Sequence, residues 1–89
     1  MDQHQKRDSL FRLLARIDNP ADIGALLDDL CTEKEIENMA ERLLTARLLM
    51  EGCTYTQVMA QADISSATLS RVSCCVQYGK GYSKLLKTK

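Results

Sequence analysis

The chain has 89 residues, of which 45% are hydrophobic, 27% are charged and 4% are aromatic, with no tryptophan. A monomer this short buries only about 60–65% of its unfolded surface. A core of mainly aliphatic side chains therefore has to be helical and closely packed, or shared with a second chain. The sequence lacks an apolar run long enough to span a membrane, and its first residues, MDQHQKRDSL, lack the apolar core of a signal peptide. We therefore expect a cytoplasmic protein with no membrane partner, forming a single helical domain over residues 1–89.

The four cysteines, Cys31, Cys53, Cys74 and Cys75, do not indicate a disulfide framework or a metal site. Zinc needs a Cys-x-x-Cys or a histidine pair, and the one histidine, His4, lies in a segment that we expect to be frayed. Without a secretory signal, cysteines usually stay reduced and act as small apolar fillers, the role we expect here. The neighbours Cys74 and Cys75 point to different helix faces, which disfavours a shared redox role.

The formal net charge is zero, but the charges are unevenly distributed along the chain. Residues 1–51 carry seven basic and eleven acidic side chains, a net charge of −4. Residues 52–89 carry Arg71 and four lysines against one acid, Asp63, a net charge of +4. Such asymmetry indicates a polyanionic partner for the basic half, with an ordinary lysine-rich tail as the alternative.

Apolar residues recur at helical spacing, and no stretch alternates as a strand does. A first helix within residues 7–19 is ended by Asn19-Pro20, and the same pair begins a second helix over residues 20–31. Thr32 and Glu35 form a capping box for a third helix from about Glu33 to Glu51, which Gly52 ends. The stripes expected to face a core are Leu10, Phe11, Leu13, Leu14 and Ile17, then Ile23, Leu26, Leu27 and Leu30, then Ile36, Met39, Ala40, Leu43, Leu44 and Leu48, widened by Leu49 and Met50.

The sequence pattern of residues 55–78 predicts two short helices joined by a tight turn. Thr54 with Gln57 forms another capping box, which begins a helix from about Tyr55 to Ala62. The side chains expected to face inward there are Val58, Met59 and Ala62. Asp63 is expected to turn with a left-handed backbone, and Ile64 to pack back against the helices.

Ser65 is the expected cap of the next helix, from about Ser66 to Tyr78, which Gly79 ends. Its expected inward stripe is Leu69, Val72 and Val76, with Ala67 and Cys75 beside it. A flexible joint from Gly79 to Gly81 and one last turn through Leu85 and Leu86 would follow.

This arrangement is a helix-turn-helix pattern. Small hydroxyl side chains on the outer face of the second helix would let it enter a major groove and bond to phosphates and base edges. We expect Ser66 and Thr68 to read bases, and Ser65, Ser70, Arg71 and Lys80 to hold phosphates. The alternative is a helical protein–protein interaction module without DNA binding. We do not expect an enzyme, because the sequence has no catalytic set, no metal ligands and no glycine-rich phosphate loop.

The segment from Leu30 to Tyr82 resembles the Trp repressor superfamily, and most closely its TrpR-like YerC/YecD branch. The resemblance lies in the start "LCT", in "ERLLTARLLMEG", "TYTQVMA" and "ATLSRV", and in the ending "YGKGY". It implies an all-α domain of five to six helices, forming an intertwined homodimer whose first three helices interlock with those of the partner. It also implies a transcriptional regulator, a repressor, that binds double-stranded DNA through the hairpin of residues 55–78.

The resemblance also implies a small-molecule site. Trp repressors hold tryptophan between two arginines, whose positions match Arg42 and Arg71, and Thr32 matches a pocket residue supplied by the other subunit. Cys75 stands where a serine helps to hold the ligand's amino group, and the hairpin turn is shorter. The candidate effector residues are therefore Thr32, Arg42, Arg71 and Cys75, with tryptophan or another small effector and no other cofactor. From the residues alone, Arg42 would instead form a helix-surface salt bridge with Glu41 or with a neighbour of Asn38, and Arg71 would contact a phosphate.

Overall fold

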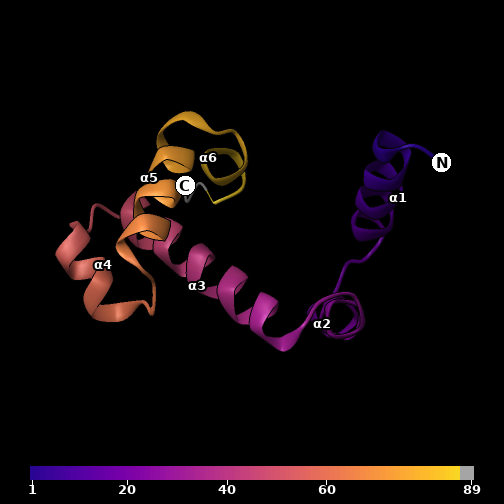
Figure 1. Ribbon diagram of the computed structural model, residues 1–89, viewed down its shortest axis with the longest axis horizontal. Helices are drawn as coiled ribbons and strands as arrows, with labels where there is room; N and C mark the ends of the chain where they lie inside the picture. Colours follow the sequence, from indigo (N-terminus) through magenta and orange to yellow (C-terminus); the bar gives the residue numbers. More distant parts are fainter. Residues whose placement is uncertain (87–89) are drawn as a thin grey trace. The chain divides into compact units, whose positions relative to one another are not determined.

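A computed structural model describes residues 1–86 of the protein. Within those residues the chain forms six α-helices and no strand, so the all-α prediction is confirmed (Figure 1). The helices are α1 (Gln3–Ala15), α2 (Pro20–Leu30), α3 (Glu33–Met50), α4 (Tyr55–Gln61), α5 (Ser66–Tyr78) and α6 (Gly81–Leu85). The chain divides into two compact units, Met1–Ile36 and Glu37–Lys89. None of the helices within residues 1–86 combines the length and the apolar character needed to cross a membrane.

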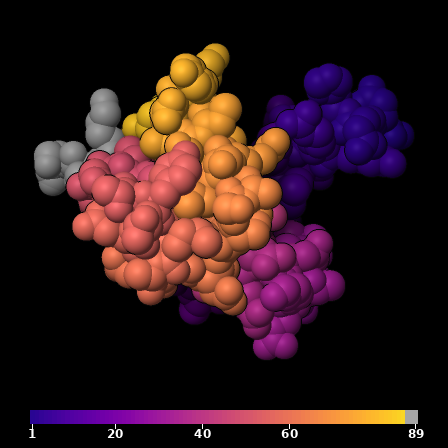
Figure 2. Space-filling model, turned by 60° about the vertical axis from the view of Figure 1, so that its left-hand side comes forward, coloured from indigo at the N-terminus to yellow at the C-terminus, as the bar shows by residue number. Residues whose placement is uncertain are grey.

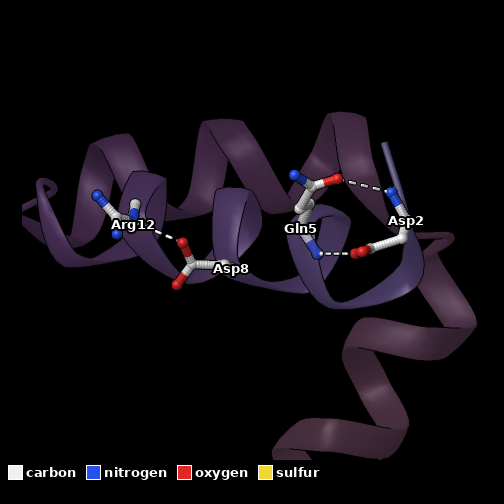
Figure 3. Close-up of polar contacts among 4 residues, drawn as sticks. All are labelled: Asp2, Gln5, Asp8 and Arg12. Atoms are coloured by element: carbon white, nitrogen blue, oxygen red, sulfur yellow. Dashed lines mark hydrogen bonds and ion pairs between the residues drawn. The ribbon is translucent and has the colours of Figure 1, made fainter.

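Helix α1 begins four residues earlier than the apolar spacing predicts, because Asp2 and Gln5 form a capping box. The Asp2 carboxylate accepts a hydrogen bond from the Gln5 N–H at 2.8 Å, and the Gln5 side chain accepts one from the Asp2 N–H at 2.8 Å (Figure 3). One turn on, Arg12 Nε donates to Asp8 Oδ2 at 2.6 Å (Figure 3). His4 therefore lies inside a capped helix, and the predicted fraying of this segment is wrong.

The caps of α2 and α3 confirm the sequence prediction. The Asn19 side chain accepts from the Asp22 N–H at 2.8 Å, and Pro20 occupies the first turn of α2. The Thr32 N–H donates to Glu35 Oε1 at 2.7 Å, and the Glu35 N–H donates to Thr32 Oγ1 at 3.1 Å. Each cap satisfies backbone groups that the first turn of a helix leaves without a partner.

The apolar stripes of α1 and α2 are only partly covered within the N-terminal unit. Neither helix contains a buried side chain. Leu10, Leu13 and Phe11 are 39%, 40% and 52% exposed, and Leu30 is 53% exposed. Within residues 1–36, α1 and α2 therefore do not form the fully buried core that their apolar spacing predicts.

The C-terminal unit has a core between α3, α4 and α5. Buried Leu48, Val58, Ala62 and Leu69 form its centre, and the partly buried residues packed against it are Leu49, Cys53 and Ile64. In Figure 1, α4, α5 and α6 gather around the C-terminal half of α3. The predicted inward positions Val58, Ala62, Leu69 and Val72 are confirmed as buried.

Several positions expected inside this core are exposed. Met59 is 45% exposed, because seven-residue α4 buries only the face that carries Val58, and Ala62, directly after the helix, is buried on the same side. Ala67 is exposed on α5 for the same kind of reason, and Val76 is only half-buried. Cys74 is exposed too, so the expectation of a filler role is wrong for it, whereas Cys53 packs against the core.

The buried face of α3 also differs from the predicted stripe. Its buried residues are Thr45, Ala46 and Leu48, whereas Leu43 and Leu44 are 39% and 38% exposed. The Thr45 hydroxyl donates to the Glu41 carbonyl oxygen at 2.8 Å. Thr45 can therefore be buried without an unpaired hydroxyl, which its polarity alone did not suggest.

The turn between α4 and α5 does not use a left-handed residue. Within residues 1–86 the one positive φ belongs to Gly52, at 96°, which follows α3 as predicted. Ala62 and Ser65 are extended, and the prediction of a left-handed Asp63 is wrong. An extended crossing is possible because the Asp63 N–H finds its acceptor on α3, in the side chain of Glu41.

Candidate functional site

Helix α5 begins at a serine cap. Ser65 Oγ accepts from the Thr68 N–H at 3.2 Å and donates to Thr68 Oγ1 at 3.0 Å. The Thr54–Gln57 capping box at the start of α4 is also present, with bonds of 2.8 and 3.2 Å. Both helices of the hairpin therefore have their first turns fixed by side chains, as the sequence predicts.

The residues predicted to contact DNA are accessible. Ser65, Ser66, Ser70 and Arg71 are exposed, and Thr68 is half-buried at the edge of that face. Lys80 is exposed in the connection that leads into α6. Figure 2 shows the surfaces of α4 and α5 side by side on one face of the C-terminal unit. The predicted recognition surface is thus free of covering elements from its own unit.

A solvent-open cavity of about 530 Å³ lies beside this surface. Its walls come from α3, α5 and α6, and they are Arg42, Ala67, Thr68, Arg71, Val72, Cys75 and Tyr82. The structure therefore brings together three of the four candidate effector residues, Arg42, Arg71 and Cys75. Thr32 belongs to the N-terminal unit and is not among the walls of the cavity.

Neither arginine of the cavity has a carboxylate partner. Within residues 1–86 the one ion pair joins Arg12 to Asp8. The alternative pairing of Arg42 with Glu41 is wrong, since no ion pair joins these two residues. Glu41 Oε1 accepts from the Asp63 N–H at 3.0 Å. Two guanidinium groups that are always charged therefore border one cavity without neutralisation from the described side chains.

A smaller cavity of about 210 Å³ adjoins the turn of the hairpin. Its walls are Asn38, Glu41, Arg42, Asp63, Ile64, Ser65 and Thr68, so it shares Arg42 and Thr68 with the larger cavity. A third cavity, of about 520 Å³, has mainly apolar walls: Leu43, Cys75, Gly79, Lys80, Gly81, Tyr82, Leu85 and Leu86. Residues 1–86 contain no cluster of three or more metal-ligating side chains.

Sequence reasoning missed Tyr82 as a wall of the cavity. Helix α6 packs against α5 and carries Tyr82 to the side chains of Arg71 and Cys75. Nothing in the periodicity of residues 79–86 says where this short helix packs, because a five-residue helix has no stripe of its own. The signal that was available is the aromatic residue directly after the Gly79–Gly81 connection.

Comparisons with known proteins agree with this geometry. The sequence model of the family described as Trp repressor protein matches residues 5–89. An uncharacterized protein of Bacillus subtilis, YerC, is 40% identical over 72 residues, which are 81% of this chain and 69% of that protein.

Two solved structures share the fold. One is a candidate Trp repressor from Staphylococcus aureus, with a TM-score of 0.86 and 32% identity over 97% of this chain and 92% of that chain. The other is a TrpR-like protein from Eubacterium eligens, with a TM-score of 0.87 and 29% identity over 92% and 86% of the two chains. The resemblance seen in the sequence is confirmed, and the chain belongs to the Trp repressor family.

Proposed function

We propose that the chain is a sequence-specific DNA-binding transcriptional regulator, a repressor, that acts as a homodimer through its helix-turn-helix. Family membership supports a DNA-binding regulator. The observation that carries the proposal is the outer face of α5, which is exposed, small and hydroxyl-rich next to Arg71. No enzymatic activity is proposed, and a role on DNA agrees with the cytoplasmic location expected from the sequence.

The proposed contacts follow from side-chain length and charge. Ser66 and Thr68 lie in the first turn of α5, the part of a recognition helix that reaches base edges, and we assign base reading to them. Ser65 and Ser70 would donate to phosphate oxygens, and Arg71 and Lys80 would supply positive charge. Because only two of these six side chains are charged, a single hairpin has little attraction for DNA, and a second copy becomes important.

The uncovered apolar residues support a dimer. Leu10, Leu13, Leu43 and Leu44 are each 38–40% exposed, and Phe11 is 52% exposed. A chain of this size rarely leaves several large apolar side chains in water unless a partner covers them. We propose that residues 1–89 act as one domain and that a second copy covers these side chains in an intertwined dimer. Two α5 helices would then lie about 34 Å apart and enter successive major grooves.

The effector site is a further part of the proposal. Arg42, Arg71 and Cys75 border the cavity of about 530 Å³, and we propose that it holds a small molecule, with Thr32 contributed by the second copy. This volume falls within the roughly 300–1,000 Å³ of small-molecule sites. Ala67, Thr68 and Arg71 belong both to the cavity and to the start of α5, so a bound molecule would touch the recognition helix itself.

The decisive experiment is a selection of bound sequences from random duplex DNA, followed by a salt titration on the recovered site. A palindrome is expected from a dimeric regulator. Arg71→Ala should lower the slope of log affinity against log salt by about 1, since one phosphate contact is lost. The matched control is Arg47→Ala, an exposed arginine of α3 outside both the hairpin and the cavity. Equal slopes for the two variants would show that Arg71 contacts no phosphate.

The alternative is that the hairpin binds a protein, and it predicts a binding affinity that hardly depends on salt. An apolar protein contact should weaken little when salt is raised tenfold, whereas DNA binding should collapse. Failure to recover any sequence would favour this alternative. The alternative is supported by the exposed side chain of Met59, which lies on the hairpin outside the recognition face.

A further inference from the structure

The helix-turn-helix hairpin is held against α3 mainly by apolar contacts. The buried residues at the centre of this packing come from α3 and from the hairpin: Leu48, Val58, Ala62 and Leu69. The hydrophobic effect that drives such packing is non-directional. A hydrogen bond, by contrast, weakens steeply when its length or angle changes. A polar contact between α3 and the hairpin would therefore fix the placement of the hairpin more strictly than burial alone.

One such polar contact is present. The Asp63 N–H, in the turn between α4 and α5, donates to Glu41 Oε1 on α3 at 3.0 Å. Within residues 1–86, every other hydrogen bond joins residues at most five positions apart, and the one ion pair, between Arg12 and Asp8, is equally local. The bond between Glu41 and Asp63 is thus the polar link between distant segments of the described chain.

Glu41 is itself held in place within α3. It lies near the middle of this 18-residue helix and is half-buried. Its carbonyl oxygen accepts from the Thr45 hydroxyl at 2.8 Å, and Thr45 is 0% exposed. A hydrogen bond that is partly shielded from water is electrostatically stronger than one in bulk water. The acceptor for the turn therefore belongs to a rigid element, which holds a partner more precisely than a loop does.

The bond lies just before the part of α5 that we assign to base reading. Asp63 precedes the cap residue Ser65 by two positions and Ser66 by three. Ala62 and Ser65 have extended backbones, and Ser65 Oγ accepts from the Thr68 N–H at 3.2 Å. A displacement of Asp63 therefore passes through a short extended segment into the first turn of α5, whose own geometry the cap fixes.

We propose that Glu41 is a positioning residue for base recognition, acting through its hydrogen bond to Asp63. Hydrogen bonds to base edges need accurate donor and acceptor positions. Attraction between phosphates and the charges of Arg71 and Lys80 acts over longer distances and tolerates small shifts. Loss of the bond therefore lowers the preference for the operator over other DNA and leaves non-specific binding in place. This inference rests on the proposed DNA-binding regulator and adds a residue outside the hairpin to its specificity.

The test compares Glu41→Ala with Glu41→Gln, which keeps a carbonyl oxygen as the acceptor. Fluorescence anisotropy gives the affinities for the operator recovered from random DNA and for a scrambled duplex of the same composition. The ratio of the two affinities should fall about tenfold or more in Glu41→Ala, the loss expected from one impaired base contact, and should be retained in Glu41→Gln. Affinity for the scrambled duplex should change equally in both variants, since both lose one negative charge.

Two control variants distinguish this effect from loss of charge and from loss of stability. Glu37→Ala removes a carboxylate one turn earlier on α3, and the Glu37 side chain forms no hydrogen bond within residues 1–86. Asn19→Ala removes the cap of α2, in the N-terminal unit, and destabilises the protein through a lost hydrogen bond of similar kind. Both controls should keep the parent's preference for the operator. A loss in Asn19→Ala as large as in Glu41→Ala would attribute the effect to general loosening and overturn the inference.

A second selection from random DNA with Glu41→Ala gives an independent readout. The recovered site should keep its half-site spacing, which the dimer determines, and lose sequence preference at the base pairs that face the first turn of α5. An undiminished preference in Glu41→Ala, or equal losses in Glu41→Ala and Glu41→Gln, would overturn the inference and leave the proposed regulator standing. A parent protein that selects no sequence would overturn the proposed regulator, and the inference with it.

Discussion

Glu41 Oε1 accepts a hydrogen bond from the Asp63 N–H at 3.0 Å, which ties α3 to the turn between α4 and α5 across 22 residues of sequence. The turn is extended, and no left-handed residue shapes it. In this extended turn the Asp63 N–H takes its acceptor from α3, in the Glu41 side chain, rather than from a neighbouring residue. Glu41 therefore positions the recognition helix without belonging to the hairpin.

Two substitutions of Glu41 distinguish the effect of its hydrogen-bond acceptor from the effect of its negative charge. Glu41→Ala should lower the free energy of unfolding by about 1 kcal/mol, because the Asp63 N–H loses its partner. Glu41→Gln keeps a carbonyl oxygen at the same reach and should stay close to the parent protein. Urea unfolding gives the free energies, and hydrogen exchange at the Asp63 amide should quicken only in the alanine variant. Equal destabilisation by both substitutions would show that the charge, rather than the hydrogen bond, is what matters.

Two neighbours on α4 should respond very differently to truncation. Val58 is 0% exposed and Met59 is 45% exposed, although the sequence pattern placed both inside. Val58→Ala should cost roughly 2 kcal/mol through lost burial and a cavity, and Met59→Ala should stay within about 0.5 kcal/mol. Denaturant midpoints measured at equal slope would rank the pair. A larger cost at Met59 would mean that a second chain covers it.

Ser65 has a structural role and a proposed binding role, which different substitutions separate. Ser65→Ala removes the acceptor for the Thr68 N–H and should cost about 1 kcal/mol of stability. Ser65→Asp keeps a good cap, and its charge suits the start of α5, so stability should be retained. Its negative charge would nevertheless face phosphates and should weaken DNA binding roughly tenfold. Unimpaired DNA binding by a stable aspartate variant would remove Ser65 from the interface.

Gly79 and Gly81, two residues apart, should differ in their tolerance of alanine. A Cβ at Gly79 would lie 2.6 Å from the carbonyl oxygen of Cys75, whereas one at Gly81 would meet nothing within 4 Å. Gly79→Ala should therefore cost about 1–3 kcal/mol, and Gly81→Ala should be neutral or slightly stabilising because alanine favours helix. Thermal unfolding followed by circular dichroism would compare them. Equal tolerance would mean that the end of α5 moves freely.

Local features of this fold are readable from the sequence. The caps at Asn19, Thr32, Thr54 and Ser65 need only residues three positions apart, and all four form as predicted. Local chemistry of this kind depends little on tertiary context. The same reasoning would have found the Asp2–Gln5 cap, had residues 1–6 been considered as a helix start.

Contacts between helices that are distant in sequence cannot be predicted from local sequence patterns. Periodicity showed that α3 has an apolar stripe, but not that its buried residues would be Thr45, Ala46 and Leu48 while Leu43 and Leu44 stay exposed. The Glu41–Asp63 bond and the place of Tyr82 likewise depend on contacts between distant segments. For the site, the exposure of Ser65, Ser66, Ser70 and Arg71 follows the prediction, and their contacts with DNA remain a prediction.

Arg42 and Thr68 are walls of both the larger cavity and the smaller one beside the turn. A molecule held in the larger cavity would therefore contact two side chains that also border the cavity beside the turn. Thermodynamic reciprocity then constrains any regulation through them: an effector that changes DNA affinity about tenfold must have its own affinity changed about tenfold by DNA. Operator DNA would thus change the affinity of the protein for the small molecule. Titrating the small molecule with and without DNA would measure the same coupling free energy as titrating DNA with and without the small molecule.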